Sequence, residues 1–246
     1  MTIGVDRAFV DLHCHTRASF DCLSSPAAVA RLAAERGLTH LAITDHHRLD
    51  GALEARAAAP LGLTVIVGEE IRTTGGDLLG LYLERPVPMG LSPADAAAAI
   101  REQGGLVGLP HPFDRFRSSG AAKIVEAAAL AELAESVDLI EAHNARALGH
   151  ANEQATRFAR DQGRPGVASS DAHTVLEVGV AYTILSGDPR SAAEMRVALD
   201  DIRLVTGRAT FFVRAWTPLA KLVQRARGNR RGSTGSTASL HPGAPA

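Results

Sequence analysis

Histidines and carboxylates fall at the ends of short apolar runs in this sequence of 246 residues. The segment DLHCHT places His13 and His15 two residues apart. On an extended strand both rings project to the same side, where they can hold one metal ion. The segment SSDAH repeats this arrangement with Asp171 and His173. A set of histidines and carboxylates without cysteine suits Zn, Mn or Fe, and favours a hydrolytic site with open coordination positions over a closed structural zinc site.

Further segments supply donors of the same kind. TDHH contains His46 and His47, VIVGEEI contains Glu69 and Glu70, and GLPHP contains His111. A single histidine in such a place is more often a surface residue or a hydrogen-bonded core residue. Histidines at several matching strand ends favour one shared site, because the strand ends of one barrel face converge on one pocket.

The elements that must position these residues alternate along the chain. From about residue 9 to about residue 212, short apolar runs alternate with longer segments of helical period, a pattern typical of repeated βα units. Ser25 and Pro26 begin one predicted helix, which ends at Gly37. The predicted strands are FVDLH, LAITDH, TVIVGEE, LLGLYL, LVGLPH, VDLIEAH, GVASSDAH and AYTILSG. Strands in this number and spacing favour a barrel or distorted barrel over an open sheet.

The composition indicates one sizeable globular core, because 46% of the residues are hydrophobic and 22% are charged. Lys and Arg (26) nearly balance Asp and Glu (27), so no overall field favours nucleic acid or a membrane surface. We find no apolar run of signal-peptide or membrane-span length in the sequence, and we expect a cytoplasmic protein without a membrane partner. Cys14 and Cys22 are expected to be free thiols.

The composition changes near the C-terminus. From Gly228 the sequence GNRRGSTGSTASLHPGAPA lacks the apolar residues that would offset the entropy of ordering. We therefore expect a metallo-hydrolase domain over residues 1–227 and a disordered tail over residues 228–246. The arginines around the start of the tail could contact nucleic acid, although a short basic tail is more often a solvated end.

The order of the motifs resembles a known family. H-x-H in DLHCHT is followed by T-D-H, G-x-E, H-P and S-D-A-H, and this series is similar to that of the PHP (polymerase and histidinol phosphatase) superfamily. The resemblance covers nearly all of the chain before the tail. It implies a single α/β domain with a distorted (β/α)7 barrel. It also implies two or three bound divalent metal ions (Mn, Zn or Fe) and the hydrolysis of phosphate esters.

The resemblance further implies which residues bind each ion. The first ion would be bound by His13, His15, Glu70 and Asp171. The second ion would share Glu70 and add His111. The third ion would be bound by Asp21, His46 and His173. Asp21 lies in a loop, where a turn or cap role is the ordinary alternative.

Three positions stay open in this assignment. Many family members carry a second-ion histidine after G-x-E, and the aligned residue here is Asp77. An aspartate can replace an imidazole, although an aspartate after two glycines is ordinarily a turn residue. His143 ends another predicted strand and could complete the second site instead. Glu70 is preferred to Glu69 because the family places its acid two residues after the glycine, here Gly68, but Glu69 stays possible.

The resulting function is a metal-dependent phosphoesterase. Clustered divalent ions attract phosphate, and a water bound between two of them loses its proton near neutral pH and becomes the nucleophile. Guanidinium groups bind phosphate bidentately, and Arg117 and Arg146 follow predicted strand ends. His47 or a metal-bound water would serve as general acid. The expected substrate is a phosphorylated small molecule, a nucleotide or a nucleic-acid end; no oligomeric state is predicted.

Two alternatives stay open. A metal-binding regulatory domain without catalysis is supported by Asp77 in place of the expected histidine. A metal-dependent amidohydrolase is the other, since such enzymes use related clusters of histidine and aspartate. The order of the motifs after H-x-H resembles PHP proteins more closely.

Overall fold

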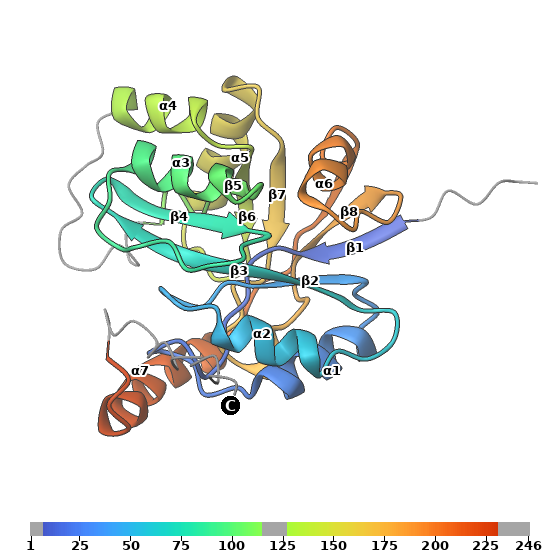
Figure 1. Cartoon of the computed structure of the whole chain (residues 1–246), viewed down its shortest axis with the longest axis vertical. Helices are drawn as coiled ribbons and strands as arrows, with labels where there is room; N and C mark the ends of the chain where they lie inside the picture. Colours follow the sequence, from blue (N-terminus) through green and yellow to red (C-terminus); the bar gives the residue numbers. More distant parts are fainter. Residues whose placement is uncertain (1–6, 115–126, 231–246) are drawn as a thin grey trace, which may run out of the picture.

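One sheet curves into a nearly closed barrel in the computed structural model, which describes residues 7–114 and 127–230 (Figure 1). In these residues the sheet has nine strands in the order β7-β6-β5-β4-β3-β2-β1-β8-β9. The strands are β1 (Arg7–Asp11), β2 (His40–Ile43), β3 (Thr64–Thr73), β4 (Gly76–Leu81), β5 (Leu106–Leu109), β6 (Leu139–Asn144), β7 (Gly166–Ser169), β8 (Tyr182–Ser186) and β9 (Ile202–Val205). The eight strands predicted from the sequence are all present, and β9 is an addition.

The sheet is mixed, with two reversed strands. The pairs β1–β2, β2–β3, β5–β6 and β6–β7 are parallel. Strand β4 is antiparallel to both β3 and β5, and β8 is antiparallel to both β1 and β9. The expected barrel-type α/β fold is therefore confirmed, with a β3–β4 hairpin inserted among the parallel strands.

The ends of β1 and β7 meet at one side of the barrel. Cys14 and Ala172 form an isolated parallel bridge beyond these strands. There the backbone N–H of His15 donates to the carbonyl of Ala172 at 2.9 Å, and that of Asp171 donates to the carbonyl of His13 at 2.8 Å. This connection brings the H-x-H and S-D-A-H motifs together, although about 160 residues separate them along the chain.

Helices cover the outside of the barrel. They are α1 (Pro26–Glu35), α2 (Asp50–Ala57), α3 (Pro93–Glu102), α4 (Ala127–Glu135), α5 (Ala151–Asp161), α6 (Ala192–Ala198) and α7 (Phe211–Ala226), with a short 3₁₀ helix, η1 (Val175–Glu177). The predicted start of α1 is confirmed, since the Ser25 side chain accepts a hydrogen bond from the Ala28 N–H at 3.2 Å. Helix α1 ends before Gly37, which adopts a positive φ of 82°.

Apolar side chains fill two regions. Buried residues of the strands, such as Val10, Ile66 and Leu139, form one cluster with Met195 of α6. A larger cluster packs helices against the outer face of the sheet. Burying each such aliphatic side chain stabilises the fold by about 1.5–3 kcal/mol. The barrel is thus a rigid support for the residues at its strand ends.

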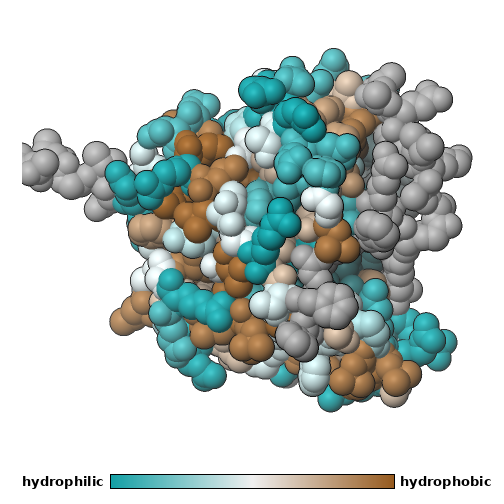
Figure 2. All heavy atoms as spheres, turned by 180° about the vertical axis from the view of Figure 1, so that it is seen from behind, coloured by the Kyte–Doolittle hydropathy of each residue, from teal (hydrophilic) through white to brown (hydrophobic). Residues whose placement is uncertain are grey.

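On the face of the molecule seen in Figure 2, polar and apolar side chains are interspersed. Among the described helices, none combines the length and the apolar character needed to cross a bilayer. At the C-terminal end, the Asn229 side chain donates to the carbonyl of Ala18 at 2.9 Å, so residues just after α7 still contact the barrel loops. Most of the predicted tail, residues 231–246, lies outside the described residues, and its disorder stays a prediction.

Candidate metal centre

Eight of the side chains predicted as metal ligands converge at one end of the barrel. They come from the loops after β1, β2, β5 and β7 and from β3 itself. The eight residues are His13, His15, Asp21, His46, Glu70, His111, Asp171 and His173. Because parallel strands end at the same rim, short strand-end segments far apart in the sequence reach a common space.

Glu70 lies at the centre of this cluster. Its Oε2 is 3.3 Å from Nε2 of both His13 and His15 and 3.4 Å from Nδ1 of His46. Its Oε1 is 3.2 Å from Nε2 of His111. One carboxylate therefore reaches four imidazole rings, which is the geometry of a group that can bridge two cations.

The two histidines of the H-x-H motif point at a shared position. The Nε2 atoms of His13 and His15 are 3.0 Å apart, and Oδ1 of Asp171 is 3.6 and 3.4 Å from them. All three residues are buried. Ring nitrogens and a carboxylate oxygen aimed at one point match the donor set that Zn, Mn and Fe prefer.

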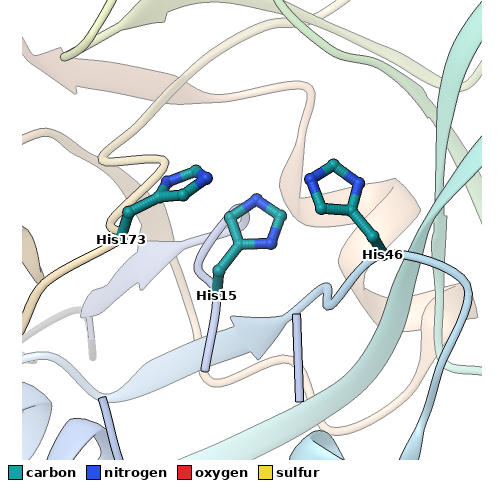
Figure 3. A group of neighbouring side chains, drawn as sticks. All are labelled: His15, His46 and His173. Atoms are coloured by element: carbon teal, nitrogen blue, oxygen red, sulfur yellow. The ribbon is translucent and has the colours of Figure 1, made fainter. Parts of the chain in front are cut away.

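A second group of rings lies beside the first. Figure 3 shows His15 between His173 and His46, and its ring centroid is 4.4 and 4.8 Å from theirs. Oδ2 of Asp21 is 3.6 Å from Nε2 of His46 and 3.5 Å from Nε2 of His173. The other oxygen of Asp21 is buried and has no hydrogen-bond donor among the described residues. A buried carboxylate oxygen without a partner is costly, and a bound cation would satisfy it.

Glu141 of β6 belongs to the site although the sequence analysis did not identify it. Its Oε1 lies 3.1 Å from Nδ1 of His13, and its Oε2 accepts from the backbone N–H of His111 at 2.7 Å. Asn144 donates to the same Oε2 and to Oδ2 of Asp171, both at 2.9 Å. Glu141 therefore contacts His13 and His111 directly and Asp171 through Asn144, and its hydrogen bonds help to orient these three predicted ligands. The signal that could have revealed it is an acid two residues before His143 on a predicted strand that ends at the site.

His15 has a comparable support. Its Nδ1 lies 3.0 Å from Oγ of Ser19, which donates to Oδ1 of Asp45 at 2.9 Å. Asp45 also accepts from the N–H and the hydroxyl of Thr16, both at 2.6 Å. A histidine held through one ring nitrogen presents the other nitrogen to the centre in a fixed direction.

Opposite charges set the protonation of the buried groups. Burial favours the neutral form of Glu70, but the neighbouring rings of His46 and His13 hold the pKa of its carboxyl well below the usual range. Burial also disfavours the ionised form of Glu141, but the nearby ring of His13 lowers the pKa of the Glu141 carboxyl to about 2. Burial, followed by the proximity of His173, lowers the pKa of His15 well below its usual value. Ionised carboxylates around a neutral imidazole are the protonation states that bind a cation.

Strained backbone aims several of these side chains. His47, His111 and Asp171 have positive φ values of 57°, 28° and 50°. Each such conformation costs a non-glycine residue about 1–3 kcal/mol, and such strain is concentrated at functional sites. The strain supports a functional rather than a purely structural role for this rim.

The candidates that the sequence left open, Asp77 and His143 for the second ion and Glu69 in place of Glu70, make other contacts. Asp77 pairs with Arg72, whose Nε lies 3.1 Å from Oδ1, because both residues face each other in the β3–β4 hairpin. Nε2 of His143 lies 2.8 Å from the carbonyl oxygen of Gly207, since an irregularity between residues 141 and 143 of β6 alters the strand alternation. Glu69 points away from Glu70 and accepts from the N–H of Val87 at 2.9 Å. The geometry therefore favours Glu70 and does not bring Asp77 or His143 to the centre.

The predicted phosphate-binding and acid residues have different surroundings. Arg146 is buried, with Nη1 2.5 Å from Oε1 of Glu177 and Nη2 2.7 Å from Oγ1 of Thr217, so its contacts are structural. Arg117 lies outside the described residues. His47 lies beside the cluster, its ring centroid 6.1 Å from that of His46. Burial, and then the proximity of His46, lowers the pKa of His47 to about 4, which favours a neutral ring over a general acid.

Two family models and two archaeal proteins match parts of this sequence. The family model of the PHP domain matches residues 11–78, and a PHP-associated model matches residues 149–201. The uncharacterized protein MJ0417 of Methanocaldococcus jannaschii is 33% identical over 176 residues, which cover 70% of this chain and 68% of that protein. The uncharacterized protein MJ1587 of the same organism is 37% identical over 114 residues, 42% of this chain and 67% of that protein.

A further relative and a solved structure extend the comparison. A 5'-3' exoribonuclease of Haemophilus influenzae is 29% identical over 130 residues, 48% of this chain and 47% of that protein. A two-domain protein of Bacteroides vulgatus, described as containing a predicted PHP-like metal-dependent phosphoesterase, superposes with a TM-score of 0.66 at 21% identity. The superposition covers 83% of this chain and 66% of that chain and shows the same fold. The motifs, the fold and the matched relatives establish that the chain belongs to the PHP superfamily.

Proposed function

We propose that the protein is a metal-dependent phosphoesterase that works with two or three divalent ions, of Mn, Zn or Fe. The observation that carries the proposal is the position of Glu70, whose two oxygens lie 3.2–3.4 Å from four histidine rings that follow three different strands. A structural metal site needs one closed set of ligands, whereas a shared carboxylate between adjacent donor sets suits a polynuclear hydrolytic centre.

The side chains divide into two adjacent groups. His13, His15 and Asp171 would hold one ion, and Glu70 would join it to a second ion bound by His111. The other group would bind an ion through Asp21, His46 and His173. When bound, such ions supply Lewis acidity for the charge that develops on a phosphoryl group.

Other residues of the chain orient the donors. The carboxylate of Glu141 would accept a hydrogen bond from Nδ1–H of His13, and in the neutral ring this tautomer leaves the lone pair of Nε2 directed at the centre. Ser19 occupies the equivalent place at Nδ1 of His15. A substrate phosphate would approach from the side of His46 and His111, the least buried members of the cluster.

The substrate class is proposed from the same charge distribution and from one relative. A centre with up to six positive charges from three ions, set against the carboxylates of Asp21, Glu70, Glu141 and Asp171, attracts a phosphate. The relative from Haemophilus influenzae is a 5'-3' exoribonuclease, an activity that breaks phosphodiester bonds, and this chain matches 47% of its length. We infer that the substrate is a phosphate ester of a small molecule, a nucleotide or a nucleic-acid end.

A metal analysis combined with a substrate panel tests the proposal. Purified protein would be assayed before and after chelation for Mn, Zn and Fe content and for hydrolysis of p-nitrophenyl phosphate, bis(p-nitrophenyl) phosphate and a 5'-phosphorylated oligonucleotide. We expect chelation to abolish phosphate release and Mn²⁺ to restore it. Substitution of Glu70 by Gln should abolish turnover, whereas Glu153→Gln on the exposed face of α5 should not change it. Metal-loaded protein that hydrolyses none of these esters would overturn the proposal.

A further inference from the structure

Helix α7 lies outside both segments that match the family models, which end at residues 78 and 201. It nevertheless contacts the metal-binding rim. Gln224, near the end of α7, is only 2% exposed. Its Nε2 donates to three backbone carbonyls of the β1–α1 loop, those of Arg17 at 2.6 Å, Ser19 at 2.9 Å and Cys22 at 2.7 Å.

These acceptors surround Asp21 in the sequence. A side-chain amide has two N–H groups, so the carbonyls of Arg17, Ser19 and Cys22 must share them. Such an arrangement draws both sides of the loop toward one atom. Asn229 adds a neighbouring bond from its Nδ2 to the carbonyl of Ala18 at 2.9 Å. The position of the Asp21 carboxylate therefore depends on hydrogen bonds that α7 and the residue after it provide.

A cavity borders the outer side of the same loop. Its volume is about 310 Å³, and it is lined by Arg17 and Ala18 of the loop, by Gly51 and Glu54 of α2, and by Gln224 among others. Gln224 lines this cavity and binds the loop carbonyls beside it, so its hydrogen bonds hold the loop on the side that faces the cavity.

A second set of contacts leads from α7 to His173, another predicted ligand of the ion that Asp21 would bind. Thr217, about two turns before Gln224, accepts from Nη2 of Arg146 at 2.7 Å. Nη1 of Arg146 pairs with Oε1 of Glu177 at 2.5 Å. Oε2 of Glu177 accepts from the backbone N–H of His173 at 3.1 Å. The chain of contacts from Thr217 therefore ends on a residue of the third predicted ion site.

We propose that α7 positions the Asp21–His46–His173 metal site, with Gln224 as the main positioning residue. The inference rests on the proposed metal centre. It assigns to the C-terminal helix a role in loading one particular ion, because α7 supports Asp21 and His173 through separate contacts. The groups around His13 and His111 depend instead on Glu141, which belongs to the barrel.

The test measures Mn²⁺ binding by the full chain with Gln224→Met, which keeps the length of the side chain and removes its donors. We expect isothermal titration to show loss of about tenfold or more in affinity for about one equivalent of Mn²⁺, the size typical when a residue supporting a metal ligand is removed. The remaining equivalents should bind as in the wild type. Arg225→Met is the matched control, because Arg225 is the next residue of α7 and its side chain is exposed.

A second variant and a second readout cover a folding defect in Gln224→Met. Asn229→Ala removes the bond to Ala18 from a half-exposed position and should weaken the same equivalent to a smaller extent. In metal-free protein, hydrogen exchange should accelerate at the amides of Arg17 and Ser19, which donate to Ser24 and Thr16, in both variants. Wild-type exchange at these amides together with wild-type Mn²⁺ affinity in both variants would overturn the inference.

The outcomes separate this inference from the proposed function. Metal binding is measured without turnover, so a wild-type protein that binds Mn²⁺ but hydrolyses no phosphoester would refute the phosphoesterase proposal alone. Normal phosphoester hydrolysis by the wild type, with unaltered Mn²⁺ binding by Gln224→Met, would refute the role of α7 alone. A wild-type protein that binds no Mn²⁺ would overturn both.

Discussion

Oε1 of Glu141 lies 3.1 Å from Nδ1 of His13, while the opposite ring nitrogen of His13 lies 3.3 Å from Glu70. Burial opposes protonation of this ring, but the carboxylates of Glu141 and Glu70 raise the pKa of His13 to about 10. A cation bound at Nε2 in place of the proton would compensate the negative charge of the same two carboxylates. His13 is therefore oriented on one side by a carboxylate of the barrel and exposed on the other to the metal centre.

The substitution Glu141→Gln tests this orientation. We expect metal affinity to fall by about 10–100-fold, because loss of the carboxylate removes the partner that fixes the ring of His13. Equilibrium dialysis against Zn²⁺ or Mn²⁺ would measure the change. Glu153→Gln changes the same chemical group in an exposed pair with His150 and serves as control. Equal affinities in the two variants would contradict the role given to Glu141.

Asp77→Asn and His111→Ala separate the candidates for the second ion site. Asp77 pairs with Arg72 and lies outside the cluster, so we expect Asp77→Asn to keep the metal content and to cost at most about 1 kcal/mol in stability. His111→Ala removes a ring 3.2 Å from Glu70 and should lower the metal content by about one equivalent. Elemental analysis after dialysis decides between them. Loss of metal from Asp77→Asn alone would restore the assignment suggested by sequence.

Arg146 provides a test of structural against substrate-binding roles. Arg146→Met would leave the buried carboxylate of Glu177 without its main cation, and we expect the free energy of unfolding to fall by about 3–5 kcal/mol. Denaturant unfolding of the metal-free protein would show this without any substrate.

Two further variants complete that experiment. The double variant Arg146→Met with Glu177→Leu should recover much of the loss, because it removes the unpaired charge as well. Arg157→Met, at an exposed position of α5, should change stability by no more than about 0.5 kcal/mol. If Arg146→Met unfolds like the wild type but raises KM for a phosphoester, Arg146 contacts substrate after all.

Metal removal should also destabilise the fold. Chelation leaves the carboxylates of Asp21 and Glu70 with only the neighbouring histidine rings, which lower the pKa of both carboxyls, in place of bound divalent ions. Binding of one ion at 100 times its Kd adds about 2.7 kcal/mol, which corresponds to a rise in Tm of about 5–10 °C for a chain of this size. Differential scanning calorimetry with EDTA and then with excess Mn²⁺ would measure it. An unchanged Tm would show that the cluster does not bind Mn²⁺ in the folded state.

Much of the fold and of the donor set follows from local sequence patterns. The spacing of His13 and His15 places both rings on one side of a strand end, and the same holds for Asp171 and His173. Alternating strand-like and helical runs predict a barrel, which brings such strand ends to one rim. Strand β9 was not predicted, because its four residues lie at the edge of the sheet and are mostly half-buried, which gives a weak apolar pattern.

The direction of individual side chains depended on contacts between distant residues. His143 ends a strand as predicted, but the irregularity in the pairing of β6 with β7 directs its ring toward Gly207. Arg146 meets Glu177 and Thr217, partners 31 and 71 residues away. The sequence by itself determined which residues stand at the rim, because strand order and period are local properties. Only the tertiary structure decided which of them face one another, because pairing register and buried charge partners are set between elements far apart in the chain.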